Sequence, residues 1–456
     1  MKTSAGKIVL SCVEGKIRRA SNGSDNWLRF LAAHKNIHKL LVAFIKSKPC
    51  ERIIADVCRE AILKYEPIDL DSGFRWLKDF RNYSENTKVN ALNEMYERSS
   101  SSKRLNWLSE IFKALDSERK ARFLKRIFYN IILNGVNRKI IRTRLMGKKD
   151  VVPNLSALML ATSSKCNLDC VECESNAERN DGEATYEQLD YIIHQAKRLN
   201  IFHVVIIGKG EPLYDPSCRK RIFRLMKTHW DLNFILITNG TTLADSDIAE
   251  LGNLDNLFTF VSIDGLKKMN DSRRGKGTYD KIMKTLERMG SRGLFYGFSA
   301  MVHRENYRHI LSIEFLNKMM EMGCKAGMYL MFLPVRESPN GKMMLNHDEY
   351  LEYNMLYNTI RNHIPMPIID PEIFENDHGC RAKRGSMIYI DGTTGKVMPC
   401  VKARYSPEEC NIYLNPHKNR LLEILKTDFF TNYRNSYIQC SQCSMFVQYV
   451  VQGQGN

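Results

Sequence analysis

The pattern of apolar and polar positions changes once along the chain, near Pro153. From Asp25 to about Arg144, apolar residues recur at steps of three and four, which places them on one face of a helix. Asp25 and the serines at 99–102 are residue types that cap helices. After Pro153, short apolar runs alternate with amphipathic stretches. The pattern therefore predicts an all-helical N-terminal region followed by an α/β region.

The α/β region contains six short apolar runs that are typical of buried strands. The expected strands cover residues 155–162, 202–207, 233–238, 258–263, 295–302 and 326–333. Stretches with helical periodicity separate them, at residues 185–199, 216–229, 245–251, 278–291 and 306–322. Strands that alternate with helices in this way are typical of linked βαβ units, and they predict a parallel sheet.

The regular alternation ends after Pro334. The remaining sequence predicts a helix near 347–362, a hairpin at 387–400 and a short helix near 419–426. Together these changes predict three domains. They are a basic helical domain at 1–150, an α/β core at 151–345 and a small cysteine-rich α+β extension at 346–456.

The composition favours a globular protein in a reducing compartment. The chain has 456 residues, of which 43% are hydrophobic, so it can build two or three packed domains. Its first thirty residues lack the apolar segment of a secretory signal, and no apolar run is long enough to cross a bilayer. We therefore expect a cytoplasmic protein whose 13 cysteines bind metal more readily than they form disulfides.

The net charge of +17 comes from the N-terminal third, because residues 1–150 hold 32 Lys and Arg against 16 Asp and Glu. Residues 119–149 carry eleven basic residues and no acidic one, with an apolar stripe between them. Such a helix suits peripheral contact with the anionic inner face of a membrane, or packing on the core with its charges in water. It would also attract an acidic peptide or RNA. Nucleic acid is less favoured, because the aromatic residues lie on the apolar face.

Three cysteines follow the first expected strand, at the spacing C-x3-C-x2-C. Cys166, Cys170 and Cys173 therefore lie in a loop at the carboxyl end of a parallel strand, where α/β proteins build their sites. A structural zinc site would need a fourth ligand, and no cysteine or histidine follows before His194. Three thiolates suit a [4Fe-4S] cluster with one iron open to another ligand. Zinc remains the alternative.

This cysteine loop, placed after the first of six βα units, resembles that of the radical S-adenosylmethionine (SAM) superfamily. The resemblance implies a partial (β/α)6 TIM-like barrel and a [4Fe-4S] cluster whose fourth iron is chelated by SAM. It also implies reductive cleavage of SAM to a 5'-deoxyadenosyl radical that activates a C–H bond, with a flavodoxin or ferredoxin as reductant. One departure is Glu172, which stands where the superfamily commonly has an aromatic residue near the adenine.

Other motifs extend the resemblance to SAM binding. GKGEP at 208–212 resembles the GGEP motif, with lysine in the place of one glycine, although the same letters also suit a tight turn. Loops after the third and fourth strands lie where related enzymes contact SAM, and one arginine matches a recurrent partner of its carboxylate. Read alone, these residues would be turn or cap residues and a solvated charged loop at Arg273 and Arg274. The candidate cofactor-binding residues are Lys209, Gly210, Glu211, Pro212, Asn239, Ser262, Asp264 and Arg274.

Four later cysteines resemble the SPASM and twitch extensions of radical SAM maturases. Cys380 and Cys400 flank Gly395 at the spacing of these extensions, and Cys440 and Cys443 form a later C-x2-C. No cysteine follows Cys443, so the shorter twitch form with one auxiliary [4Fe-4S] cluster is the better match. Structural zinc on the same four thiolates is the alternative. Cys410 could replace one of these ligands. Isolated cysteines elsewhere, namely Cys12, Cys50, Cys58, Cys218 and Cys324, are expected to be buried for packing.

The sequence thus predicts a radical SAM enzyme acting on a peptide or another large substrate. A membrane lipid is an alternative substrate, and a noncatalytic basic metal-binding protein is the alternative from another class. No single residue stands out as a general acid or base.

Overall fold

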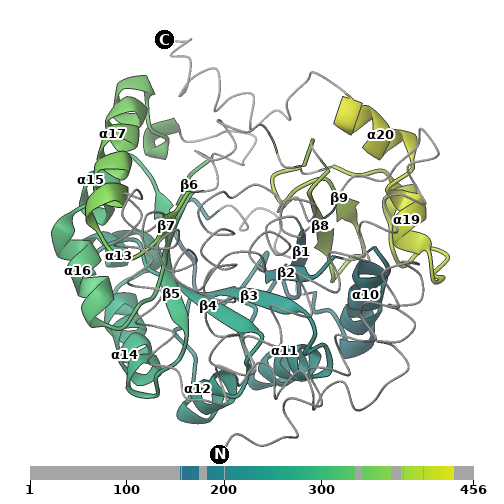
Figure 1. The fold of residues 1–456 in the computed structure, drawn as a ribbon, viewed down its shortest axis with the longest axis horizontal. Coiled ribbons are helices and arrows are strands. Elements are labelled where there is room, and N and C mark those ends of the chain that lie inside the picture. The colour runs from purple at the N-terminus through teal and green to yellow at the C-terminus, as the bar shows by residue number, and fades with distance from the viewer. Residues whose placement is uncertain are drawn as a thin grey trace, which may run out of the picture. The chain divides into compact units, whose positions relative to one another are not determined.

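The computed structural model of the protein describes most of residues 155–435. The described residues are 155, 157–173, 182–199, 201–333, 341–370, 380, 382–383, 385–403 and 405–435. The expected N-terminal helical domain at 1–150 lies outside them. Figure 1 shows the described elements, with strands in the interior and helices around them.

The described strands form one nine-stranded sheet in the order β7-β6-β5-β4-β3-β2-β1-β8-β9. Neighbouring strands are parallel throughout, except for the antiparallel pair β8 and β9. The strands are β1 (Ala157–Ala161), β2 (His203–Ile206), β3 (Asn233–Thr238), β4 (Leu257–Ser262), β5 (Tyr296–Val302), β6 (Gly327–Met331), β7 (Ile368–Ile369), β8 (Met387–Asp391) and β9 (Val397–Met398). All six strands expected from the sequence are therefore present, in sequential order and parallel.

The connecting helices cover the outside of this sheet (Figure 1). They are α10 (Tyr186–Arg198), α11 (Pro216–Thr228), α12 (Asp245–Gly252), α13 (Lys267–Arg274), α14 (Thr278–Ser291), α15 (Tyr307–Ile310), α16 (Ile313–Glu321), α17 (His347–His363), α19 (Arg420–Ile424) and α20 (Asp428–Asn435). Helix α10 begins with a capping box, in which the Thr185 hydroxyl accepts from Gln188 N and the Gln188 side chain accepts from Thr185 N. The parallel arrangement of β1 to β8 places the loops that follow these strands at one end of the sheet.

The main core lies between the sheet and the outer helices. Alternate residues on each strand point outward, so that Leu158 and Leu160 of β1 pack in one cluster with Leu189 and Ile192 of α10. All four are at most 1% exposed. Burial of this face fixes the register of each strand, because a shift of one residue would turn its apolar side chains inward.

Two expectations for the helices need correction. The single helix expected at 306–322 is divided into α15 and α16, because the Ser312 hydroxyl accepts from Phe315 N and starts a new helix. The charged segment around Arg273 and Arg274, which alone would suggest a solvated loop, forms helix α13. Both arginine side chains are largely buried there, since they pair with a buried carboxylate.

The expected hairpin at 387–400 is present as β8 and β9, and it also extends the core sheet. Strand β8 pairs in parallel with β1, in a register that runs from Ala157 opposite Met387 to Ala161 opposite Asp391. The two backbones come close where the strands end, because a Cβ on Gly392 would lie 2.6 Å from the Ala161 carbonyl oxygen. The C-terminal part of the chain thus contributes a strand beside the one that leads into the cysteine loop.

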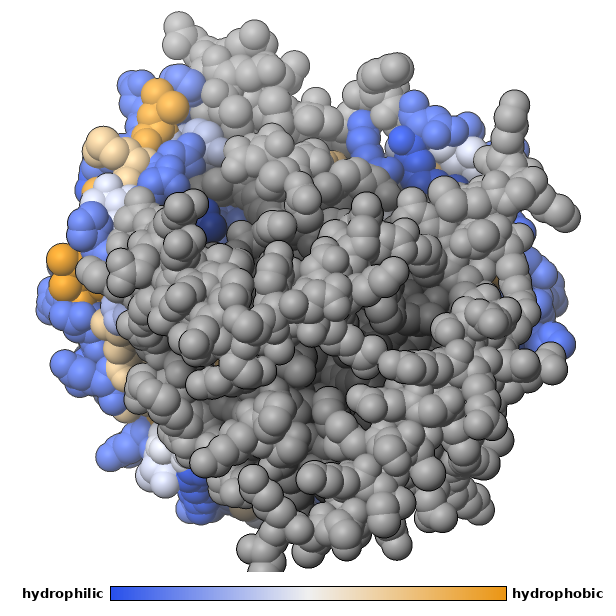
Figure 2. Space-filling model, in the orientation of Figure 1, coloured by the Kyte–Doolittle hydropathy of each residue, from blue (hydrophilic) through white to orange (hydrophobic). Residues whose placement is uncertain are grey.

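Exposed apolar side chains are few in the described part. Figure 2 shows apolar colour on the side of the molecule that carries α16 and α17, where Ile313, Leu351 and Met355 are more than half exposed. Isolated residues of this kind are ordinary on protein surfaces. Among the described helices, none combines the length and the apolar character that crossing a membrane would require.

Candidate functional site

The cysteine loop leaves β1 and is bound to the loops that follow its neighbours. The amide of Val171 donates to the Arg273 carbonyl at the end of α13, at 2.8 Å. The Asn167 side chain donates to the Thr241 hydroxyl at 2.8 Å and accepts from the Asn239 amide nitrogen at 3.0 Å. The loop after β1 is thereby fixed to the loop after β3 and to the helix after β4.

None of the three cysteines of this loop is part of a disulfide in the described structure. Cys170 is buried, whereas Cys166 and Cys173 are half-buried. Burial raises the pKa of Cys170, and the nearby guanidinium groups of Arg274 and Arg273 act in the opposite direction. The bare thiol is thus mainly protonated, and a cationic ligand would favour its thiolate form.

The GKGEP loop packs directly against the backbone that precedes the first cysteine. Gly210 N donates to the Ser163 carbonyl at 3.1 Å, and Glu211 N donates to the Lys165 carbonyl at 2.7 Å. A Cβ on Gly210 would lie 1.9 Å from the Lys165 carbonyl oxygen. Only glycine allows this approach of the two loops. Pro212, the last residue of the motif, is buried, and it has no amide hydrogen that would need a partner.

Glu211 connects the same loop to the end of β3. Its carboxylate accepts from Leu213 N at 3.0 Å and from Asn239 N at 2.6 Å, and also from the Thr238 hydroxyl. The side chain is 3% exposed, and burial raises its pKa. Its contacts lie within the protein, so Glu211 holds the loops after β2 and β3 together.

Asp264, two residues after β4, is completely buried between two arginines. Its Oδ2 atom accepts from Arg273 Nη1 and Arg274 Nε, each at 2.7 Å, and its Oδ1 atom accepts from Met301 N at 2.9 Å. Although burial opposes ionisation, the guanidinium groups of Arg274 and Arg273 hold the pKa of Asp264 well below its usual range. The ionised carboxylate therefore fixes the position of both arginines.

Ser262 and Lys209 are placed by contacts with neighbouring strands. The Ser262 hydroxyl, at the end of β4, lies 3.1 Å from the Ser299 hydroxyl of β5. Lys209 Nζ lies 3.0 Å from Asp391 Oδ2 at the end of β8. The lysine that replaces a glycine of the motif thus joins the cysteine-loop side of the sheet to the C-terminal segment.

The four C-terminal cysteines are described only in part. Cys380 is half-buried, and Cys400 is 7% exposed just beyond β9. Cys440 and Cys443 lie outside the described residues. Cys410 is fully buried in the main core. Cys218 and Cys324 are each 2% exposed, as expected for packing residues.

The loop at Cys166, Cys170 and Cys173 fits the iron-sulfur cluster and SAM that its spacing implies. It presents three thiols that are not in disulfides, with the guanidinium groups of Arg273 and Arg274 near Cys170, and Gly210 lets the loop after β2 pack against the backbone that precedes the first cysteine. The bridging residues Asn167 and Thr241, and the partner Asp391, were not identified from the sequence. Asn167 stands between two cysteines, but its amide becomes informative only once the loop after β3 lies beside it.

Comparison with known protein families finds one family model that matches part of this chain. Residues 160–316 match the family model described as "Radical SAM superfamily". The matched segment contains the cysteine loop, the GKGEP loop and the arginine pair. The family model thus assigns residues 160–316 of the chain to the radical SAM superfamily, in agreement with the resemblance seen in the sequence.

Two curated proteins illustrate the similarity in sequence. Mycofactocin maturase MftC of Mycolicibacterium smegmatis is 28% identical over 179 residues, covering 39% of this chain and 43% of that protein. MftC of Mycobacterium tuberculosis is 31% identical over 145 residues, covering 31% of this chain and 36% of that protein. The chain thus spans less than half the length of these curated relatives.

A solved structure supports the fold. The structure of Streptococcus suis SuiB bound to precursor peptide SuiA aligns with a TM-score of 0.53 at 18% identity, over 69% of this chain and 74% of SuiB. The sheet order and this alignment together confirm the expected partial (β/α)6 barrel. None of these relatives favours the alternatives of a lipid substrate or a noncatalytic binding protein.

Proposed function

We propose that this protein is a radical SAM enzyme that cleaves SAM reductively and acts on a peptide. The observation that supports it best is the attachment of the C-x3-C-x2-C loop to three other site loops. Hydrogen bonds to Ser163, Lys165, Asn167 and Val171 fix that loop from the GKGEP motif, the end of β3 and the end of α13. A loop held on three sides keeps its ligands in one geometry while a substrate binds and leaves.

In this proposal Cys166, Cys170 and Cys173 would hold a [4Fe-4S] cluster, and SAM would bind beside it. Together the cluster and SAM would supply radical chemistry that activates an otherwise unreactive C–H bond, with one electron taken from an external reductant. A thiol that ligates metal loses its proton, and at Cys170 the guanidinium groups of Arg274 and Arg273 favour the charged form.

The candidate SAM-binding residues have distinct roles in this proposal. Gly210 lets the GKGEP loop pack against the backbone that precedes Cys166, and Arg274 pairs with the SAM carboxylate. Asp264 is a positioning residue, because its buried carboxylate holds Arg274 by two of its nitrogens, at 2.7 and 3.3 Å. Glu211 and Asn239 position the loop, and Ser262 and Lys209 line its neighbours.

The remaining parts of the proposal concern the extension and the substrate. We assign 151–345 to the radical SAM core and 346–456 to a twitch-like extension, with 1–150 as a separate helical domain. Cys380, Cys400, Cys440 and Cys443 would hold an auxiliary [4Fe-4S] cluster. A peptide substrate is supported by the maturase names of the curated relatives and by the precursor peptide bound to SuiB. A flavodoxin or ferredoxin would supply the electron.

Anaerobic loading with iron and sulfide, followed by addition of SAM and dithionite, tests the proposal. We expect about eight irons per chain and formation of 5'-deoxyadenosine. Cys170→Ala should lose at least a hundredfold of that product, whereas Cys324→Ala, which changes a buried cysteine far along the sequence from the motif, should retain it. Zinc in place of iron, or equal product from Cys170→Ala, would overturn the proposal. Mass spectrometry of short peptides encoded beside the gene tests the substrate class.

A further inference from the structure

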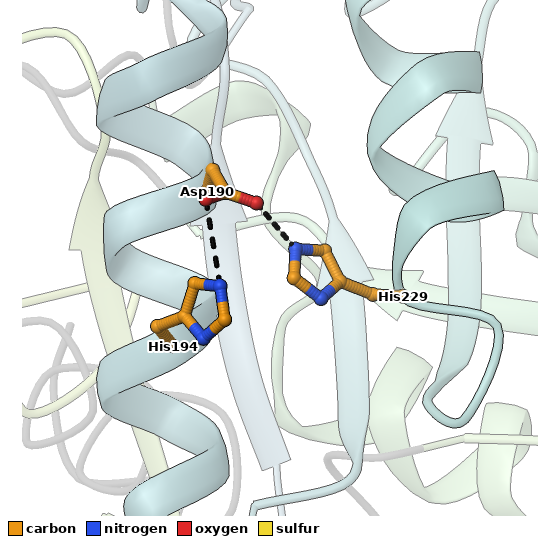
Figure 3. A group of neighbouring side chains, drawn as sticks. All are labelled: Asp190, His194 and His229. Atoms are coloured by element: carbon orange, nitrogen blue, oxygen red, sulfur yellow. Dashed lines mark hydrogen bonds and ion pairs between the residues drawn. The ribbon is translucent and has the colours of Figure 1, made fainter.

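Two histidines and one aspartate meet on the outer layer of the barrel, away from the cysteine loop. Asp190 and His194 stand four residues apart on α10, and therefore on the same face of that helix. His229 ends α11. The three side chains offer one nitrogen or oxygen ligand atom each, and these atoms all lie within 4.8 Å of one another. Figure 3 shows the two imidazole rings directed at a single carboxylate.

The contacts of this cluster are close to those of a metal site. His229 Nε2 lies 2.8 Å from Asp190 Oδ1, and His194 Nε2 lies 3.5 Å from Asp190 Oδ2. In a tetrahedral site with bonds of about 2.0–2.1 Å, neighbouring ligand atoms lie about 3.3 Å apart. A metal ion can therefore replace the hydrogen bonds of the cluster with only small movements of the side chains.

Burial prepares His229 as a ligand. The residue is 1% exposed, so its ring is held in place beside Asp190 by the surrounding residues. Its Nδ1 atom is buried and has no hydrogen-bond partner among the described residues. The polar contact of the ring is therefore the one made by Nε2, which points into the cluster.

The surroundings leave the site accessible from solvent. The His194 side chain is 60% exposed, which gives an ion a route to the cluster. Lys197, a cation that acts on His229, is itself paired with Asp231 at 2.6 Å. Two imidazoles and one carboxylate suit zinc, cobalt or nickel, whereas magnesium and calcium prefer ligands that are all oxygen.

We propose that Asp190, His194 and His229 bind one divalent transition-metal ion, with a fourth position open to water. The site lies at the end of α11, and helices in βα units run opposite to the strands. It is thus at the end of the sheet opposite the cysteine loop. A metal there would tie together α10 and α11, the helices that follow the cysteine loop and the GKGEP loop. This role is structural, and it does not depend on the proposed reaction.

Cobalt binding to the iron-loaded holoenzyme tests the site, because loading with iron occupies the competing thiols. Equilibrium dialysis with Co²⁺ should give one cobalt per chain in the wild type, with the visible absorption of four-coordinate cobalt and no thiolate-to-cobalt band. His194→Ala and Asp190→Asn should bind cobalt at least tenfold more weakly. His363→Ala removes another exposed histidine, at the end of α17, and should bind as the wild type does.

Because the His194 side chain is exposed, we expect His194→Ala to fold like the wild type. Circular dichroism of the metal-free proteins checks this expectation. If the iron-loaded wild-type protein bound no cobalt, the proposed site would be overturned. Equal cobalt binding by His194→Ala and the wild type would do the same. Since the variants are compared with one another, the result is independent of whether SAM is cleaved.

Discussion

Lys209 and Asp391 form an ion pair that joins the loop after β2 to the end of β8, with 3.0 Å between Nζ and Oδ2. The Asp391 side chain has no exposed surface, and that of Lys209 is 16% exposed. The pair therefore connects the GKGEP loop to the C-terminal segment through a buried contact. In the proposed enzyme it couples the position of the GKGEP loop to the extension that follows.

Removing only one member of this ion pair should destabilise the protein. In Lys209→Met the carboxylate of Asp391 remains buried without its cation, which should lower the free energy of unfolding by about 3–5 kcal/mol. The double variant Lys209→Met/Asp391→Asn should recover part of that loss, because no buried charge is left unpaired. Urea unfolding of the four proteins in the cycle measures the coupling. Strictly additive losses would show that the two side chains do not interact.

Removing the carboxylate of Asp264 should also destabilise the protein. Asp264→Asn leaves two largely buried guanidinium groups without their counterion, with an expected loss of about 3–5 kcal/mol. Because the folded pKa of Asp264 lies below its ordinary value, this stabilisation is present above about pH 4 and is lost only on further acidification. The difference between variant and wild type should thus be constant from pH 6 to pH 8. Asp280→Asn, at an exposed pair with Lys267, serves as the control and should show no measurable change.

The close approach at Gly210 predicts a specific loss of cluster binding. In Gly210→Ala the new methyl group would overlap the Lys165 carbonyl, so the loop that carries the cysteines must move. We expect the variant to retain less than half of the iron of the wild type after anaerobic loading. Gly252→Ala is the matched control, since its Cβ would meet only the end of the Leu294 side chain at 3.3 Å. Equal iron in both variants would contradict the role given to the GKGEP loop.

His303, just after β5, predicts a dependence of stability on pH. It is 1% exposed, neither ring nitrogen has a partner among the described residues, and burial lowers its pKa to about 4. The imidazole binds a proton more tightly in the unfolded chain than in the folded protein. The free energy of unfolding is therefore not reduced by this group above about pH 6.5, and it decreases as the pH falls from 6.5 toward 4. Between pH 7 and 5.5 the loss should be about 1 kcal/mol.

The variant His303→Leu should remove that part of the pH dependence while leaving stability near pH 7 almost unchanged, since no hydrogen bond is lost. Denaturant titrations of wild type and variant at both pH values measure the difference. An unchanged pH dependence in His303→Leu would show that the imidazole stays accessible to protons in the folded state.

The sequence predicted the strands better than the contacts between loops. Apolar runs such as 233–238 reproduce β3 to the residue, because one face of this strand is buried and the other is half-buried, which leaves a strong local pattern. Helix α13 was missed because its residues are mostly polar, and its arginines are buried only through Asp264. The hairpin at 387–400 was predicted, but its pairing with β1 was not, since a contact over more than two hundred residues leaves no local signal.

The candidate site divides in the same way. The C-x3-C-x2-C spacing identified Cys166, Cys170 and Cys173 directly, because ligand spacing is a local property. The partners that fix their loop, such as Asn167 and Asp391, depend on which strand ends lie side by side. The GGEP-like motif has Lys209 where the motif has a glycine, and this difference is explained only by Asp391, which β8 places next to the lysine.

The central claim is that one iron of the cluster at Cys166, Cys170 and Cys173 is open to SAM. Electron paramagnetic resonance of the dithionite-reduced Cys380→Ala/Cys400→Ala variant, which lacks two ligands of the proposed auxiliary cluster, tests it most directly. We predict that adding SAM changes the g values of the reduced cluster, and that Cys170→Ala in the same background gives no such signal. A reduced cluster whose spectrum is identical with and without SAM would contradict the account.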